Sequence, residues 1–120
     1  MAGHNQKTGK TAEDAACQFL QTQGLRLIAK NWRSRQGEID LIMQDHDHVV
    51  FVEVRTRKND HFGSASESVG RKKRQNLIRT SMSFLQTRGW SEQKNGRYDV
   101  IGIVNGQLEW IRNAFDADDQ

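Results

Sequence analysis

Two β-rich runs, residues 38–44 and 49–55, are separated by four polar residues. A gap of this length between alternating runs predicts an antiparallel hairpin with its turn centred between residues 46 and 47. Apolar and polar side chains alternate within each run, so one face of the hairpin is apolar and suits packing against a helix. We expect that face to carry Ile39, Leu41, Met43, Val50, Val52 and Val54.

The opposite face of this hairpin gathers charged side chains. In the expected register Asp40 faces Glu53, and Glu38 faces Arg55. Two carboxylates directly opposite each other repel, so a compensating positive charge is expected between them. A divalent cation would supply it, because Mg²⁺ takes oxygen ligands and is often held by one or two carboxylates together with phosphate and water. The alternative is a surface hairpin whose acids pair with basic neighbours, such as Glu38 with Arg55.

The rest of the pattern predicts helices and further strands around the hairpin. Apolar residues at helical spacing indicate helices over 11–23 and 67–88, with a polar loop before the second helix. Its packed side is expected to hold Leu77, Ile78, Ser81, Met82, Phe84 and Leu85. Further β-rich runs indicate strands over 25–32, 98–104 and 107–111, the last two joined by Asn105-Gly106, a strong hairpin signal.

Length and pattern together predict the fold class. A chain of 120 residues is expected to form one domain with a modest core. We expect a single α/β domain over 1–120, with a mixed central sheet of about five strands flanked by helices. The ends, 1–8 and 116–120, are expected to be flexible.

The chain's basic residues are concentrated in its middle. The net charge is +3, but residues 55–97 alone hold eleven Lys and Arg against three Asp and Glu. Such a block suits a polyanionic partner such as nucleic acid, whose affinity comes largely from neutralised phosphates. The alternative is a solvated basic helix face.

Several classes of protein are excluded by what the sequence lacks. No apolar run approaches the ~18 residues needed to span a bilayer, and the polar start lacks the apolar middle of a signal peptide. The single cysteine, Cys17, excludes an internal disulfide and a multi-cysteine zinc site, and is expected to be a small, partly buried hydrophobe rather than a nucleophile. His46 and His48 lie in a turn without the further ligands that structural zinc needs. We therefore expect a cytoplasmic protein that is not attached to a membrane.

The charged hairpin also carries a family resemblance. The runs 37–42 (GEIDLI) and 51–57 (FVEVRTR) look like the GEID and FVEVK signatures of the YraN-like bacterial proteins. That family has the restriction-endonuclease-like PD-(D/E)XK fold and is similar to archaeal Holliday junction resolvases. The resemblance continues through Glu13-Asp14 and Ala16, Asn31-Trp32-Arg33, Phe62-Gly63, Lys72, Arg97-Tyr98-Asp99 and Asn113-Ala114-Phe115.

The resemblance implies a metal-dependent DNA endonuclease, and by analogy with the resolvases a branched substrate. It implies that Asp40, Glu53 and the backbone carbonyl of Val54 hold Mg²⁺ or Mn²⁺, and that Glu13 completes the site from the first helix. Glu38 and Asp99 would hold these ligands in position without binding the metal themselves. The basic residues expected to position the DNA backbone are Arg57, Lys58, Arg71, Lys72, Lys73, Arg74 and Arg79. Because junction resolvases work as dimers, a homodimer is an expectation from the resemblance alone.

The chain departs from the family at one position, where Arg55 replaces the signature lysine. Arginine stays protonated, so it cannot act as a general base, although it can orient water or stabilise charge on phosphorus. The alternative to a nuclease is therefore a nucleic-acid-binding adaptor that keeps the fold without cleavage. A third hypothesis, an assembly protein with a vestigial pocket, predicts neither DNA binding nor metal affinity.

Overall fold

The structure is a computed structural model that describes residues 3–57, 69–90 and 95–117. Within these ranges the chain forms two helices and five strands. In chain order they are α1 (Gly3–Thr22), β1 (Arg26–Ser34), β2 (Gly37–Asp45), β3 (His48–Arg57), α2 (Arg71–Arg88), β4 (Asn95–Val104) and β5 (Gln107–Phe115). No helix in the described ranges is long and apolar enough to cross a membrane.

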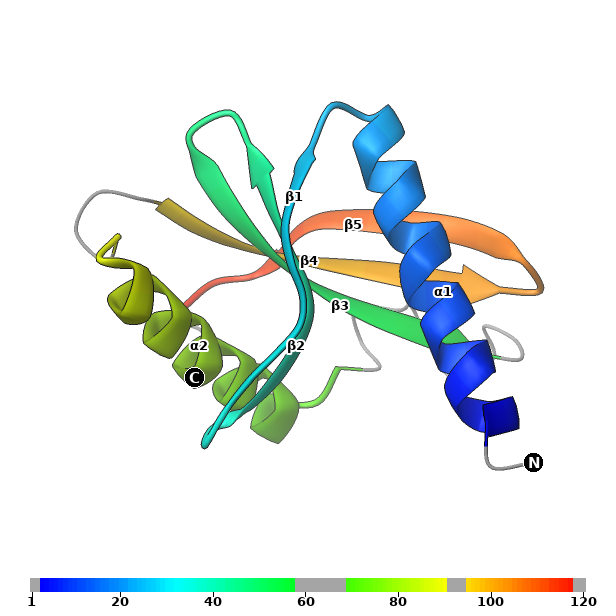
Figure 1. The fold of residues 1–120 in the computed structure, drawn as a ribbon, viewed down its shortest axis with the longest axis horizontal. Helices are drawn as coiled ribbons and strands as arrows, with labels where there is room; N and C mark the ends of the chain where they lie inside the picture. Colours follow the sequence, from blue (N-terminus) through cyan, green and yellow to red (C-terminus); the bar gives the residue numbers. More distant parts are fainter. Residues whose placement is uncertain (1–2, 58–68, 91–94, 118–120) are drawn as a thin grey trace.

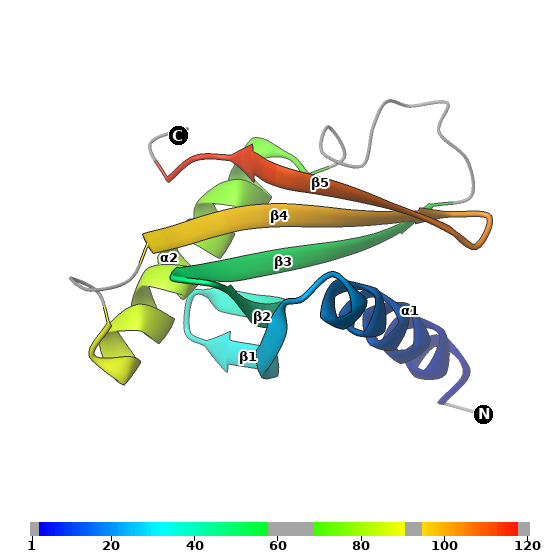
Figure 2. The ribbon, with the colours of Figure 1, turned by 90° about the horizontal axis from the view of Figure 1, so that it is seen from above.

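The five strands form one mixed sheet in which spatial order follows chain order, β1-β2-β3-β4-β5 (Figure 1). β3 and β4 are parallel, and the other neighbouring strands are antiparallel. A tight turn cannot join parallel strands, which explains why α2 lies between β3 and β4 in the sequence. Figure 1 and Figure 2 show α1 and α2 well apart, on either side of β1 and β2. This is an α/β fold, consistent with the expected restriction-endonuclease-like arrangement.

Each face of the sheet is covered by one helix. On one face, α2 contributes Leu77, Ile78 and Phe84 to a cluster that contains Ile42, Val49, Phe51 and Val100. On the other face, α1 contributes Ala16, Cys17 and Leu20 to a cluster that contains Leu41, Met43, Val50, Val52 and Ile101. Successive residues of β3 enter opposite clusters, so this strand is buried on both sides, as strands in sheets covered by helices are.

The hairpin of β2 and β3 has the predicted register but not the predicted single apolar face. Its pairs run from Leu41 opposite Val52 to Asp45 opposite His48, which confirms the turn position. Ile39, however, belongs to the α2-side cluster and Leu41 to the α1-side cluster. Regular alternation would put both on one face, so β2 must turn over at Asp40. The neighbouring strand is distorted at the same level, where Asn31 has a left-handed φ of 49°.

The two helices differ from their predicted limits. α1 begins at Gly3 rather than near Thr11, because polar residues extend the helix before its apolar stripe starts. α2 begins at Arg71 rather than at residue 67, after the extended residue Gly70. The prediction that Met82 packs was wrong: it is 53% exposed, and Thr80 is buried instead. The Thr80 hydroxyl donates to the Asn76 carbonyl at 2.6 Å, which allows a polar side chain to be buried there.

The hairpin of β4 and β5 is confirmed and is longer than predicted. Asn105 and Gly106 both have positive φ, 52° and 76°, as a two-residue turn of this kind requires. β5 continues to Phe115 past an irregularity opposite Asp99, where Asn113 has a φ of 51°. The Asn113 N–H donates to Asp99 Oδ1 at 2.9 Å, so a side chain replaces the missing ladder partner. The polar loop expected over 57–66 lies outside the described residues, apart from Arg57.

Candidate functional site

Asp40 of β2 and Glu53 of β3 lie side by side at the end of the paired part of the hairpin. The paired register ends at Leu41 and Val52, Asp40 and Glu53 are the next residue beyond it on each strand, and the charge of Glu53 acts on Asp40. The Asp40 carboxylate also reaches across the strands, where its Oδ2 accepts a hydrogen bond of 2.8 Å from the Val54 N–H. The local distortion of β2 therefore fixes one oxygen of Asp40 against β3. The structure brings together the two acids that the sequence placed opposite each other.

Burial of this pair makes its two negative charges costly. Glu53 is only 4% exposed. Burial, followed by the charge of Glu53, raises the pKa of Asp40 to about 7, although the Val54 N–H partly opposes the shift. Near neutral pH a proton therefore occupies Asp40 for much of the time. A bound cation would offset the cost of burying these two charges in the same way as the proton on Asp40 does.

Glu13 of α1 belongs to the same group of acids. Its pKa is raised, mainly by burial and then by the negative charge of Asp40, while a hydrogen bond with Asn31 lowers it. The side chain therefore lies within electrostatic reach of Asp40. The sequence pattern predicted neither the left-handed backbone of Asn31 nor its hydrogen bond with Glu13.

Two cations approach Glu53 on one oxygen. Nη1 of Arg55 lies 3.7 Å from Glu53 Oε2, and Nζ of Lys73 lies 3.6 Å from the same atom. Oε1 of Glu53 is buried and, among the described residues, has no hydrogen-bond partner. A buried carboxylate oxygen without a partner is costly, and it is the atom best placed to accept a metal ion. The sequence predicted Lys73 as a phosphate contact, but gave no sign of its proximity to Glu53.

The donor set fits a hard divalent cation. Within the described ranges no group of three or more His, Cys, Asp or Glu side chains is arranged to enclose a metal. Mg²⁺ does not need such a cage, since one or two carboxylates, waters and a substrate phosphate can complete its shell. Glu53 Oε1 and the oxygen of Asp40 that Val54 does not bind are the side-chain atoms available for this role. The carbonyl of Val54 and the Glu13 carboxylate are the further ligands that the resemblance implies.

The sequence profile of the Uncharacterised protein family UPF0102 matches residues 12–103, a range that contains Glu13, Asp40 and Glu53. The chain belongs to the UPF0102 family. A UPF0102 protein of Pseudomonas fluorescens is 48% identical over 113 residues, which cover 92% of this chain and 94% of the relative. A relative in Stutzerimonas stutzeri is 47% identical over 117 residues, covering 94% of this chain and 98% of the relative. One in Ectopseudomonas mendocina is 46% identical over 120 residues, covering 98% and 100%.

Glu38 lies within electrostatic reach of Glu13, because its negative charge helps to raise the pKa of that carboxyl, whereas Asp99 lies apart from the proposed metal ligands of this UPF0102 chain. Glu38 pairs with Arg33 of β1 at 3.5 Å, whereas Arg55 lies 3.7 Å from Glu53. Asp99 is opposite Val52 on the α1 side of the sheet, whereas Glu53 faces Lys73 of α2. The hydrogen bonds that Asp99 accepts come from two nitrogens of Arg97, from the Trp110 indole and from the Asn113 N–H.

The basic residues of the UPF0102 chain are divided between solvent and structure. Arg71, Lys72 and Lys73 are exposed in the first turn of α2, and Arg79 is exposed further along it. Arg74 has a structural role, because its Nε donates to the Val69 carbonyl at 2.9 Å and its guanidinium stacks over Phe115. Arg57 ends β3. Lys58 lies outside the described residues.

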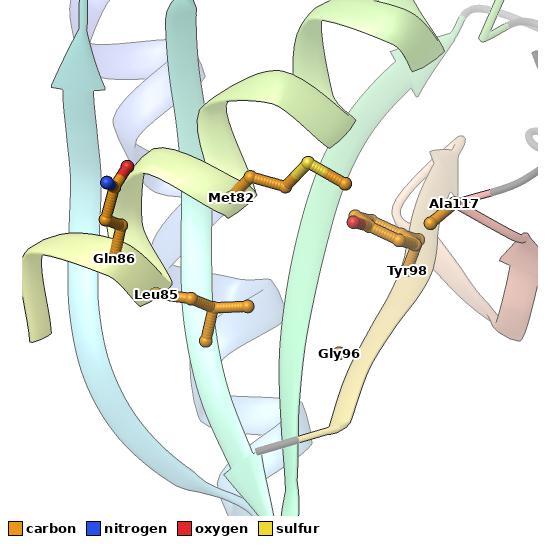
Figure 3. A pocket seen from close by; sticks show the side chains of 6 residues that line it. All are labelled: Met82, Leu85, Gln86, Gly96, Tyr98 and Ala117. Atoms are coloured by element: carbon orange, nitrogen blue, oxygen red, sulfur yellow. The ribbon is translucent and has the colours of Figure 1, made fainter. Parts of the chain in front are cut away.

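Among the described residues of the UPF0102 chain, two hollows of about 430 Å³ each lie away from Asp40 and Glu53. One is apolar, and Figure 3 shows Met82 of α2 pointing toward Tyr98 of β4 across it. The other lies beside the β2–β3 turn and is lined by Asp45, His46, His48, Arg97 and Arg112, among others. Cys17 is buried in the α1-side cluster, and burial raises the pKa of its thiol, as expected of a packing residue rather than a nucleophile.

Proposed function

We propose that this protein is a divalent-cation-dependent nuclease that hydrolyses phosphodiester bonds in DNA. The proposal rests on the Asp40–Glu53 pair, in which Glu53 is buried and Asp40 partly buried. Among the described residues one Glu53 oxygen has no hydrogen-bond partner, and two cations lie near the other. Charge of both signs is what a phosphoryl-transfer site requires: acids to hold a metal, and cations to receive the phosphate. Four-way junctions are the branched substrate that the resemblance suggests.

In this proposal Asp40, Glu53 and the Val54 carbonyl hold Mg²⁺ or Mn²⁺, with Glu13 as a further acid. When bound, the metal polarises the phosphate and lowers the pKa of a water molecule. The chain's own contribution is positioning. The Val54 N–H orients Asp40, and Arg55 stabilises the negative charge that grows on the phosphate. The exposed first turn of α2 fixes the DNA backbone beside the site.

The proposal is tested by cleavage of labelled duplex, single-stranded, flap and four-way-junction DNA in Mg²⁺ or Mn²⁺, with and without EDTA. Asp40→Asn should abolish cleavage while keeping the shape of the side chain. A matched control is Asp47→Asn, the same change in the β2–β3 turn, where the side chain is 82% exposed. We expect cleavage by the wild type and by Asp47→Asn, and none by Asp40→Asn or in EDTA. Equal cleavage by both variants would trace the activity to a contaminant.

A DNA-binding adaptor is the second candidate, and Arg55 is the observation that favours it. An arginine cannot take a proton from water, so the position that carries lysine in the family signature has lost that option here. The adaptor predicts no cleavage of any DNA in the panel, together with binding that weakens steeply as salt rises. The same panel therefore separates the two candidates.

A further inference from the structure

Lys73 and Arg55 contact the same oxygen of Glu53, but they are held very differently. Arg55 extends from β3, two residues from Glu53, and carries a planar guanidinium that is always charged. Lys73 comes from α2 and ends in a compact ammonium on a flexible four-carbon stem. The Lys73 side chain is 46% exposed, whereas Glu53 is almost fully buried. Lys73 can therefore reach both the buried acid and the solvent in front of it.

The position of Lys73 on α2 explains why it faces the acids. Leu77, four residues later, packs in the α2-side cluster, and residues four apart lie on the same face of a helix. Lys73 thus continues the sheet-facing stripe of α2 beyond the core. Its charge also lowers the pKa of Asp40, so it acts on both carboxylates of the pair. Lys72, the adjacent residue, is exposed on a different side of the helix.

We propose that Lys73 is an exchangeable cation of this site, which neutralises Glu53 when no metal is bound and contacts the DNA phosphate once Glu53 holds a metal. This inference rests on the proposed nuclease function. A doubly charged ion on Glu53 removes the attraction for the ammonium and repels it toward the solvent. The same movement would leave a positive charge on the solvent side of the acids, from which the DNA phosphate approaches in this proposal. Lys73 then couples metal occupancy to DNA affinity, a role that Arg55 is less suited to because it lies on the same strand as Glu53, two residues away, and lacks the flexible four-carbon stem of lysine.

The test compares Lys73→Met with the matched control Lys72→Met, which removes the same charge from the neighbouring residue. Mn²⁺ binding is measured by calorimetry, and binding of a labelled DNA duplex by fluorescence anisotropy in Ca²⁺ and in EDTA. We expect Lys73→Met to bind Mn²⁺ about three to five times more tightly, because the ion no longer displaces an ammonium. Lys73→Met should also lose the gain in DNA affinity that Ca²⁺ gives the wild type. Lys72→Met should leave Mn²⁺ affinity unchanged and weaken DNA binding equally in both buffers.

Lys73→Arg provides a second variant that keeps the charge, and we expect its Mn²⁺ affinity to match the wild type. Thermal unfolding of all three variants checks that they are folded. Identical behaviour of Lys73→Met and Lys72→Met in both assays would overturn the inference and leave the nuclease proposal standing. If the wild type bound no Mn²⁺, or if Asp40→Asn bound it equally well, the proposed function and this inference would both fail.

Discussion

At the scale of single residues, the distinctive feature is a pair of acids that the fold keeps together against their repulsion. Val54 holds one oxygen of Asp40, while Arg55 and Lys73 lie near one oxygen of Glu53. The cost shows in the raised pKa of Asp40, which is caused first by burial and then by repulsion from Glu53. An arrangement that costs stability, when the neighbouring positions are well packed, is typical of functional sites.

The pKa of Asp40 predicts how stability depends on pH. In the unfolded chain this carboxyl loses its proton near its ordinary pKa of 3.8, whereas the folded protein keeps it until about pH 7. The folded state therefore binds more protons between these values, and Asp40 lowers stability as pH rises through this window. Asp40→Asn has no such decline, so above pH 7 it should be more stable than the wild type by about 1–3 kcal/mol.

Thermal unfolding at pH 5 and pH 8 measures this difference, at roughly 4 °C in Tm per kcal/mol. The gap between variant and wild type should be small at pH 5 and larger at pH 8. Added Mg²⁺ should raise the Tm of the wild type at pH 8 and leave Asp40→Asn unchanged, since the ion replaces the missing proton. A gap that did not change with pH would show that Asp40 is not the titrating group.

Substitutions of Arg55 should change the rate of DNA cleavage. If the guanidinium only stabilises charge on the phosphate, a lysine at the same position can do so too and can also lose a proton. We expect Arg55→Lys to cleave at the wild-type rate or up to about tenfold faster, and Arg55→Gln to be slower by about 10- to 100-fold. Single-turnover cleavage of the preferred substrate measures both. Equal losses in the two variants would mean that the geometry of the guanidinium itself is required.

At the scale of elements, the parts that could be predicted are those whose signals are local. The turn at His46 and the Asn105-Gly106 turn each connect two alternating runs, so turn position and register follow from short stretches of sequence. The start of α1 and the end of β5 were missed. Polar residues without periodicity form the first turns of α1, and the continuation of β5 depends on the Asp99 side chain from another strand.

In the candidate site, too, only the residues whose positions depend on local signals could be predicted from the pattern. Asp40 and Glu53 come from one hairpin, so their proximity follows from register alone. The proximity of Lys73 to Glu53 depends on how α2 packs over the sheet, and no pattern within α2 gives that position. Glu13 was placed at the site by resemblance and not by its spacing, because α1 docks through contacts distant in sequence.

Asp99 predicts a structural role for the hairpin of β4 and β5. It is buried and receives hydrogen bonds from Arg97, Trp110 and Asn113, so its loss leaves a largely buried guanidinium without a main partner. We expect Asp99→Ala to lower the free energy of unfolding by about 3–5 kcal/mol. Asp116→Ala, at an exposed position beyond β5, should change it by less than about 0.5 kcal/mol.

Urea unfolding measures these two changes, and Asp99→Asn gives a milder variant that keeps the side-chain shape. Mn²⁺ affinity of Asp99→Asn should equal that of the wild type, because Asp99 and Glu53 lie on opposite faces of the sheet. Weaker metal binding at unchanged stability would instead support the role behind the ligands that the resemblance implied for Asp99.

At the scale of the whole molecule, positive charge is distributed unevenly between the two ends of the β2–β3 hairpin. The basic first turn of α2 lies beside the buried acids, whereas Asp45 and its arginine partners lie near the β2–β3 turn, at the other end of that hairpin. Arg97 and Arg112 each form an ion pair with Asp45 there, so their positive charges are largely neutralised. A polyanion should therefore approach the end of the sheet where Lys73 and Glu53 meet.

This asymmetry predicts a difference in salt dependence between two double variants of equal net charge. Arg71→Gln with Lys72→Gln removes charge from the first turn of α2. Arg26→Gln with Arg112→Gln removes it near the β2–β3 turn, where Arg26 lies opposite Gln44 and Arg112 pairs with Asp45. The slope of the logarithm of DNA affinity against the logarithm of salt concentration should become shallower by about two for the first variant only, if both of its side chains contact phosphates. Anisotropy titrations of a duplex in Ca²⁺ at several salt concentrations measure the slope. Equal changes in both variants would indicate a diffuse charge effect, and a wild-type affinity insensitive to salt would assign the basic turn to solvent.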